Sequence, residues 1–216
     1  MLMEINQYID HTLLKPDATV DGIRQLCEEA AAHKFAAVCI NPCYIEPAVD
    51  LLQGTGVKVA TVIGFPLGAA LTAVKVFEAG EAVLRKADEL DMVINLGMAK
   101  LGCWQAVTDE IKQVVQAAQG GKVKVIVETG CLTDEEKRRA CQSVLAGGAD
   151  FIKTSTGFGP GGATEADIKL FKSIVGGNIG IKASGGIRTR LQAEAMIAAG
   201  ADRIGTSAGV AILKGQ

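Results

Sequence analysis

The sequence predicts an α/β protein that folds as a closed (β/α)₈ barrel, the TIM-barrel fold. Short apolar runs typical of strands alternate with helix-period segments along all 216 residues. The runs are almost continuously apolar, as in parallel strands that are buried on both faces. Eight strand–helix units in a chain of this length favour a closed barrel, for which ~250 residues is typical. An open doubly wound sheet is the alternative, but the G-x-G-x-x-G pattern expected after its first strand is missing here.

The eight units follow one another without a break. The predicted strands are residues 9–14, 36–41, 57–64, 90–96, 123–129, 151–156, 179–184 and 203–206. The predicted helices are residues 19–33, 44–52, 71–87, 104–118, one that begins near 133, one that begins at 164, 190–199, and a short closing helix. Thr133 and Glu136 form a capping-box pattern at a helix start, and glycine often follows a predicted helix end. No linker or low-complexity stretch divides the chain, so we expect one domain over residues 1–216.

Composition excludes several classes of protein. The net charge of −2 offers no basic surface for nucleic acid. The N-terminus lacks the basic and apolar regions of a signal peptide, and the most apolar window, residues 59–74, is shorter than the ~20 residues of a spanning helix. The six cysteines contain no C-x-x-C pair, and two histidines do not provide zinc-ligand spacing. We therefore expect a cytoplasmic protein with reduced thiols, most of them core residues, and no membrane or nucleic-acid partner.

Two lysines stand inside predicted strands. Lys153 follows Phe151 and Ile152 and precedes a Thr-Ser-Thr-Gly turn, and Lys182 occupies the same place in a Gly-Ile-Lys-Ala-Ser-Gly-Gly run. A buried lysine loses solvation as a cation, so its pKa falls and its neutral amine becomes a nucleophile. A second lysine nearby would depress that pKa further. This pattern predicts imine chemistry on an aldehyde or ketone.

One acidic residue in a predicted strand completes this cluster. Asp91 lies at the start of an apolar run and shares a strand face with Val93 and Asn95. It could move protons in an imine mechanism, although a structural salt bridge is nearly as good an interpretation of its spacing. Lys124 lies on the next strand, and we expect it to be a structural partner of an inner carboxylate. Cys39 lies close to the functional end of its strand and could line the pocket.

Glycine-bearing loops follow the last three predicted strands. They contain Thr156-Gly157, Ser184-Gly-Gly186 and Gly205-Thr-Ser207. Glycine allows backbone N–H groups to approach an anion, and many barrels hold phosphate in the loops after strands seven and eight. The expected substrate carries a phosphate a few atoms from a carbonyl carbon.

The chain resembles the deoxyribose-phosphate aldolase family of class I aldolases over almost its whole length. The motifs that carry the resemblance are residues 9–16, 38–42, 62–68, 89–95, 127–129, 151–157 and 181–188. The resemblance implies reversible cleavage of 2-deoxy-D-ribose 5-phosphate to glyceraldehyde 3-phosphate and acetaldehyde, without a metal or organic cofactor. It places the Schiff-base lysine at Lys153, the second lysine at Lys182 and the proton-relay acid at Asp91. It assigns phosphate contacts to Gly157, Gly185, Gly186 and Ser207, and it implies a homodimer or homotetramer.

The chain also departs from this family. Phe158 stands where some members have a lysine, which would weaken the electrostatic capture of phosphate, and the sequence ends at Gln216 without the tyrosine tail of other members. Three other functions are left open: a different Schiff-base aldolase, a sugar-phosphate isomerase or lyase that uses acid–base chemistry alone, and a phosphosugar-binding protein without activity. The last is a poor fit, because a binding pocket does not need two desolvated lysines.

Overall fold

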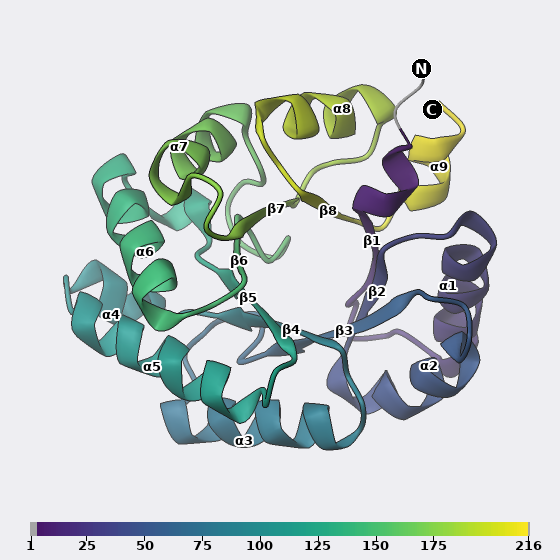
Figure 1. Ribbon diagram of the computed structural model, residues 1–216, viewed down its shortest axis with the longest axis horizontal. Coiled ribbons are helices and arrows are strands. Elements are labelled where there is room, and N and C mark those ends of the chain that lie inside the picture. Colours follow the sequence, from purple (N-terminus) through teal and green to yellow (C-terminus); the bar gives the residue numbers. More distant parts are fainter. Residues whose placement is uncertain (1–3, 216) are drawn as a thin grey trace.

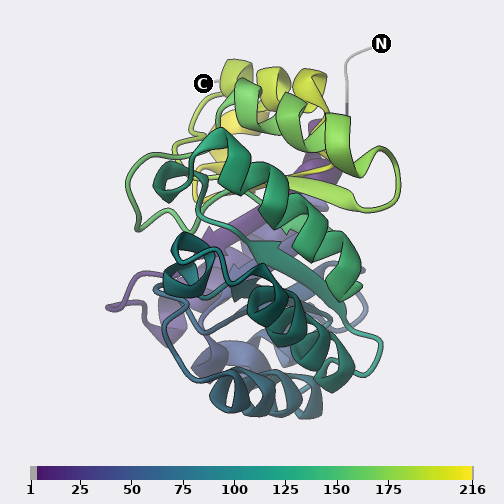
Figure 2. The same cartoon turned by 90° about the vertical axis from the view of Figure 1, so that its left-hand side faces the viewer.

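The computed structural model describes residues 4–215 and consists of a closed barrel of eight parallel strands in the order β1 to β8. The ring closes where β1 pairs with β8, with Ile9 opposite Ile204 and His11 opposite Thr206. Figure 1 looks into this ring, and the helices lie around its outside; Figure 2 shows the same layers from the side. The predicted (β/α)₈ barrel is confirmed, and the open sheet is excluded.

The elements follow the predicted order; β8 has the predicted bounds, and the other strands are shorter than predicted. The strands are β1 (Ile9–Leu13), β2 (Ala37–Ile40), β3 (Lys58–Ile63), β4 (Glu89–Val93), β5 (Lys122–Ile126), β6 (Phe151–Lys153), β7 (Gly180–Ser184) and β8 (Arg203–Thr206). The helices are α1 (Val20–His33), α2 (Ile45–Leu52), α3 (Thr72–Leu84), α4 (Leu96–Lys100), α5 (Trp104–Ala117), α6 (Asp134–Gly147), α7 (Glu165–Val175), α8 (Arg190–Ala199) and α9 (Gly209–Leu213). Three short 3₁₀ segments complete the described chain: η1 (Ile5–Tyr8), η2 (Pro42–Tyr44) and η3 (Thr129–Cys131).

The end of β4 differs most from the sequence prediction. The predicted strand continued to residue 96, whereas β4 ends at Val93 and the unpredicted helix α4 begins at Leu96. The Asn95 side chain caps this helix by accepting a hydrogen bond from the N–H of Met98 at 3.1 Å. This local bond competes with the sheet ladder, so an apolar run that looks like strand becomes a helix start.

The two faces of each strand enter different environments. Outward residues such as Val125, Ile152 and Ile181 are buried against the helices in the main hydrophobic core. Inside the barrel, a small apolar cluster formed mainly by β2 and β3 includes Cys39 and Val62. The remaining strands direct charged side chains inward, so the interior of the barrel is part apolar and part ionic.

A buried ion pair outside the barrel holds the end of β4. Lys75 on α3 is fully buried, and its Nζ lies 2.9 Å from Oε1 of Glu110 on α5 and 2.8 Å from the carbonyl oxygen of Val93. Burial lowers the pKa of this lysine, and the Glu110 carboxylate opposes that shift. Lys75 thus has a structural role through these two partners. Burial alone does not make a lysine reactive.

Two further expectations concern the burial of the cysteines and the presence of a membrane-spanning helix. Cys27, Cys39 and Cys141 are buried, but Cys43 and Cys103 are exposed, so the prediction of core cysteines is wrong for these two. Cys43 lies within η2, and Cys103 is the residue before α5, where the chain runs over the surface. In the part of the chain that the structure describes, no helix is both long and apolar enough to cross a membrane.

Candidate active site

The register of the barrel places the predicted lysines side by side. Lys153 on β6 is the direct neighbour of Lys182 on β7, and Asp91 on β4 is the direct neighbour of Lys124 on β5. Neighbouring strands lie about 4.8 Å apart, so side chains on the inner face at the same level come into contact. All four side chains point into the barrel and are buried.

Asp91 is the centre of this cluster. Its Oδ2 lies 2.7 Å from Nζ of Lys153 and 2.7 Å from Nζ of Lys182, while its Oδ1 lies 2.7 Å from Nζ of Lys124. One carboxylate therefore contacts three lysines, and Lys153 and Lys182 share a single oxygen atom. The three residues predicted as catalytic are brought together, and Lys124 has the inner-carboxylate partner that was expected.

Three more charged residues belong to the cluster and were not predicted. Asp10 on β1 contacts Lys182 and Arg203, and Glu89 on β4 lies 2.6 Å from Lys124 and 3.1 Å from Arg203 on β8. Each interrupts a predicted strand or flanks it at an inward position. Glu89 stands two residues before Asp91 on the same strand face, a spacing that could have found it, whereas Asp10 and Arg203 are single charges near strand ends.

The charges of this cluster do not balance when every base is protonated. Three carboxylates, Asp10, Glu89 and Asp91, face four cations, Lys124, Lys153, Lys182 and Arg203. Lys124 and Lys182 each contact two or more of the carboxylates, whereas Lys153 contacts Asp91 alone. Lys153 is therefore the cation that the cluster can release most easily, because its loss leaves three negative and three positive charges.

The pKa shifts follow from this geometry. Burial lowers the pKa of Lys153, and the positive charge of Lys182 adds to that shift, while Asp91 opposes it. Burial also disfavours the cation of Lys182, but Asp10 and Asp91 outweigh it and raise the pKa of that lysine. The two adjacent amines thus have opposite shifts, and Lys153 is the one that becomes neutral and nucleophilic.

The carboxylates are held in their charged form. Burial acts to raise the pKa of Asp91, but Lys124, Lys153 and Lys182 bring it well below its usual range. Asp10 behaves in the same way, with a pKa of about 2 beside Lys182 and Arg203. Asp91 is consequently a charged carboxylate that contacts the amines of both lysines.

Cys39 lies deeper than expected. Its thiol is fully buried, its Sγ is 3.8 Å from Oδ2 of Asp91, and burial raises its pKa. It is not among the residues that line the pocket described next, so the suggestion that it could line this pocket is not supported.

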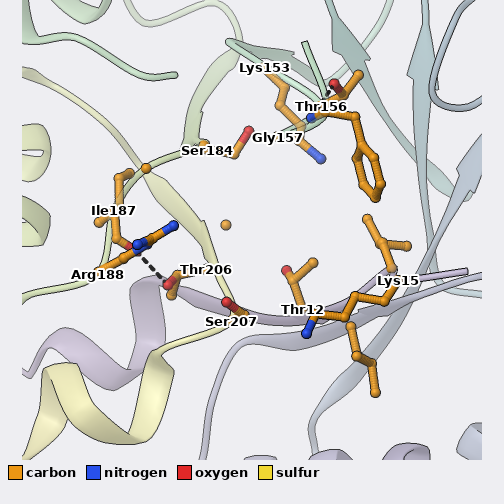
Figure 3. Close-up of a pocket in the computed structure, with 16 residues that line it drawn as sticks. Thr12, Lys15, Lys153, Thr156, Gly157, Ser184, Ile187, Arg188, Thr206 and Ser207 are labelled. Atoms are coloured by element: carbon orange, nitrogen blue, oxygen red, sulfur yellow. Dashed lines mark hydrogen bonds between the residues drawn. The ribbon is translucent and has the colours of Figure 1, made fainter. Parts of the chain in front are cut away.

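A pocket of about 400 Å³ opens above Lys153 at the carboxyl ends of the strands. Lys182 and Asp91 lie beneath it and are fully buried. The lining residues come from four strand ends: Thr12, Leu13, Leu14 and Lys15; Lys153, Thr156, Gly157 and Phe158; Ser184, Gly185, Gly186, Ile187 and Arg188; and Gly205, Thr206 and Ser207. Figure 3 shows the labelled residues around one open space, with Arg188 on one side and Lys15 on the other. The four predicted phosphate contacts all line this pocket together with Lys153.

The composition of this lining favours an anionic ligand. Three of the sixteen lining residues, Lys15, Lys153 and Arg188, are basic and none is acidic. Among residues 4–215, no carboxylate pairs with the exposed side chains of Lys15 or Arg188. Both cations were missed as site residues, because each lies in a loop where a single charge gives no periodic signal.

Backbone donors add to this field. The N–H groups of Gly157, Gly185, Gly186 and Ser207 donate no hydrogen bond to the protein within the described chain. Gly157 and Gly186 have φ of +86° and +79°, a backbone conformation that other residues rarely adopt. Unpaired N–H groups on such loops are typical of phosphate sites.

The fold and the site together define a barrel enzyme with a desolvated lysine at the floor of an anion-accepting pocket, an arrangement typical of Schiff-base lyases. A sequence model of the DeoC/LacD family of aldolases matches residues 5–215, and the chain belongs to this family. It is 55% identical over 214 residues to a deoxyribose-phosphate aldolase of Streptococcus equi subsp. zooepidemicus, an alignment that covers 99% of this chain and 97% of that protein. It is 57% identical over 215 residues to one from Thermoanaerobacter sp., with 98% and 96% coverage. A solved tetrameric structure of deoxyribose phosphate aldolase from Aeropyrum pernix has a TM-score of 0.91 and 37% identity, with 97% of this chain and 89% of that one covered.

Proposed function

We propose that this protein cleaves 2-deoxy-D-ribose 5-phosphate reversibly to D-glyceraldehyde 3-phosphate and acetaldehyde through an imine on Lys153. The observation that carries the proposal is the position of Lys153. Its amine contacts Asp91 in the ionic cluster, and its side chain also lines the pocket that contains no acidic residue. The names of the relatives from Streptococcus and Thermoanaerobacter support the choice of sugar.

The reaction begins at the neutral amine of Lys153. It attacks the C1 aldehyde of the open-chain sugar, and loss of water gives the imine. The C2–C3 bond then breaks as the C3 hydroxyl loses its proton, which releases glyceraldehyde 3-phosphate and leaves an enamine on Lys153. Protonation at C2 and addition of water release acetaldehyde and restore the amine.

Asp91 and Lys182 handle protons in this scheme. Oδ2 of Asp91 lies 2.7 Å from the Nζ atoms of both lysines. A proton that leaves Lys153 can therefore pass directly to Asp91, whose position Lys182 fixes. Such general acid–base help contributes ~10²–10⁴-fold to rate. The charge on Lys182 also disfavours protonation of Lys153 and so keeps the nucleophile available.

The phosphate group occupies the upper pocket in this proposal. The N–H groups of Gly157, Gly185, Gly186 and Ser207 donate to its oxygens, and Arg188 and Lys15 supply positive charge. The absence of a lysine at Phe158 is thereby offset by cations from two other loops.

An assay of the purified protein tests this function directly. With 2-deoxyribose 5-phosphate as substrate, we expect equal amounts of acetaldehyde and glyceraldehyde 3-phosphate, each measured by a coupled dehydrogenase. Turnover of another phosphosugar with none of this one would assign the chain to a different Schiff-base aldolase.

Replacing Arg188 by methionine should raise the KM for 2-deoxyribose 5-phosphate about tenfold, since one charge-assisted contact to phosphate contributes at least ~1.4 kcal/mol. The KM for unphosphorylated 2-deoxyribose should not change. Arg139→Met on the surface of α6 is the matched control. An equal loss for both sugars would show that Arg188 does not read the phosphate.

We also propose that the protein works as a homodimer or homotetramer. Five large apolar side chains of α3 and the residues before it are exposed: Leu67, Leu71, Val74, Phe77 and Leu84. Apolar patches of this kind mark association surfaces, and the relative from Aeropyrum pernix is a tetramer. A second copy of this chain is the proposed occupant.

Phe77→Glu should shift the protein to a smaller species in native mass spectrometry, because a charge would enter the apolar contact. Leu191→Glu on α8 places the same charge on an isolated exposed leucine and should leave the assembly intact. A monomeric wild type would refute self-association.

A single catalytic domain and a cytoplasmic location complete the proposal, and the six free thiols favour a reducing compartment.

A further inference from the structure

Glu128 has a backbone conformation that is unusual for its residue type. It follows β5 with φ of +54° and ψ of 68°, in the left-handed region, where a residue other than glycine is strained. Its side chain is buried, with 3% exposed. Strain of this kind persists where surrounding contacts enforce it, and it is frequent near active sites. The proton-transfer scheme above makes no use of this carboxylate.

The contacts that enforce this conformation come from the pocket loop. Oε2 of Glu128 accepts hydrogen bonds from Oγ1 of Thr156 at 2.5 Å and from the N–H of Thr156 at 3.3 Å. Oγ1 of Thr156 in turn accepts a hydrogen bond from the N–H of Phe158 at 3.0 Å. Both polar hydrogens of Thr156 are therefore directed at Glu128 and away from the pocket.

The loop also closes over the carboxylate. A Cβ on Gly159 would lie 2.7 Å from the Cδ of Glu128, so the chain passes close over this carboxylate at a residue without a Cβ. A Cβ on Gly130 would lie 1.6 Å from the carbonyl oxygen of Pro160, so the loops after β5 and β6 meet backbone to backbone. The second oxygen, Oε1, is buried without a hydrogen-bond partner among the described residues. Glu128 is thus enclosed by the segment that it holds.

The held segment carries one of the pocket's free backbone donors. Thr156, Gly157 and Phe158 line the pocket, and the unpaired N–H of Gly157 lies between two residues that are tied to Glu128 directly or through Thr156. Figure 3 shows Thr156 and Gly157 next to Lys153 at the edge of the open space. Phe158 also packs edge-on against Phe65, with ring centroids 5.4 Å apart.

We infer that Glu128 is a positioning residue that orients the Gly157 N–H for the phosphate of the substrate. It acts through Thr156, and it forms no ion pair with Lys153 in the described structure. A carboxylate beside a phosphate site would repel the ligand if it faced the pocket. Its two bonds to Thr156 and the cover of Gly159 turn the charge away from the pocket. The inference rests on the proposed function, because it assigns the phosphate to this loop.

The test compares variants that separate side chain from backbone. Glu128→Gly removes the carboxylate and relieves the left-handed strain, whereas Glu128→Gln keeps an oxygen that can accept from Thr156. Thr156→Val removes the hydroxyl donor from the other side. Gln119→Gly is the matched control, since Gln119 also has a left-handed backbone, with φ of +47°, but is exposed and lies outside the pocket lining.

Two readouts distinguish positioning from a general loss of structure. Calorimetric titration with inorganic phosphate gives an affinity that does not depend on turnover. Steady-state kinetics on 2-deoxyribose 5-phosphate and on unphosphorylated 2-deoxyribose separates the phosphate contact from the chemistry at Lys153. We expect Glu128→Gly and Thr156→Val to weaken phosphate binding, and to raise the KM for the phosphosugar, by about tenfold, the loss expected for one charge-assisted hydrogen bond.

The Glu128→Gln variant and the unphosphorylated sugar show whether Glu128 acts on the phosphate contact. Glu128→Gln should recover most of the affinity, and in Glu128→Gly and Thr156→Val kcat/KM should fall several-fold more for the phosphosugar than for the unphosphorylated sugar. Equal losses for both sugars, or unchanged phosphate affinity in Glu128→Gly, would overturn the inference. If the wild type binds phosphate but does not cleave the phosphosugar, the proposed function fails while the phosphate titrations still decide the role of Glu128. A wild type that does not bind phosphate overturns the inference as well.

Discussion

Lys153→Ala is expected to abolish aldol turnover and to leave the barrel folded. Loss of the nucleophile removes the covalent route, so the rate should fall by roughly 10⁴-fold or more. Stability should be preserved, because Lys153 is the surplus cation and its removal leaves three carboxylates with three bases. Acetaldehyde release and the free energy of unfolding in denaturant measure the two effects.

Two further variants control this result. Lys100→Ala removes a surface lysine that pairs with Glu136 and should turn over at the wild-type rate. Lys153→Arg keeps a positive charge, but its guanidinium group cannot form the imine. Substantial turnover by Lys153→Arg would contradict the covalent mechanism and favour an isomerase or lyase that uses acid–base chemistry alone.

Asp91→Asn should slow turnover by ~10²–10⁴-fold, the usual contribution of a general acid or base. It should also destabilise the protein by ~3–5 kcal/mol, because three buried lysines lose the carboxylate that they share. Initial rates and denaturant unfolding measure these losses, and Asp109→Asn on the exposed surface of α5 is the control.

The dependence of rate on pH gives Asp91 a distinct signature. The wild-type rate should rise with pH as Lys153 loses its proton, and it should level off below the ordinary lysine pKa of 10.5. The Asp91 carboxylate raises the pKa of Lys153, so its removal lowers that pKa and moves the rising limb to lower pH. An unchanged profile at the wild-type rate would leave Asp91 with a structural role only.

The sequence was sufficient for the fold and for the faces of the inner strands. Eight continuous apolar runs alternating with helices lead to a closed parallel sheet, and alternation along each strand puts Lys153 and Lys182 on the inner face. The register of the strand pairs, such as Ile9 opposite Ile204 where β1 meets β8, could not be read from the chain. It depends on how distant strands pack, which no local pattern encodes.

The site residues that were not predicted were missed for similar reasons. Asp10 and Arg203 are ordinary charges near strand ends until register brings them together inside the barrel. Lys15 and Arg188 lie in loops, where a charged residue has no periodicity to mark it. Helix α4 replaced a predicted strand end because Asn95 forms a local cap that outweighs the apolar run around it.

The central claim is that Lys153 is the amine that the ionic cluster leaves free to react. It is tested most directly by borohydride reduction in the presence of acetaldehyde, followed by peptide mass spectrometry. We predict a gain of one ethyl group on Lys153 and none on Lys182 or Lys124, which the carboxylates keep protonated. An adduct on Lys182, or no adduct on any lysine of the folded protein, would contradict this account.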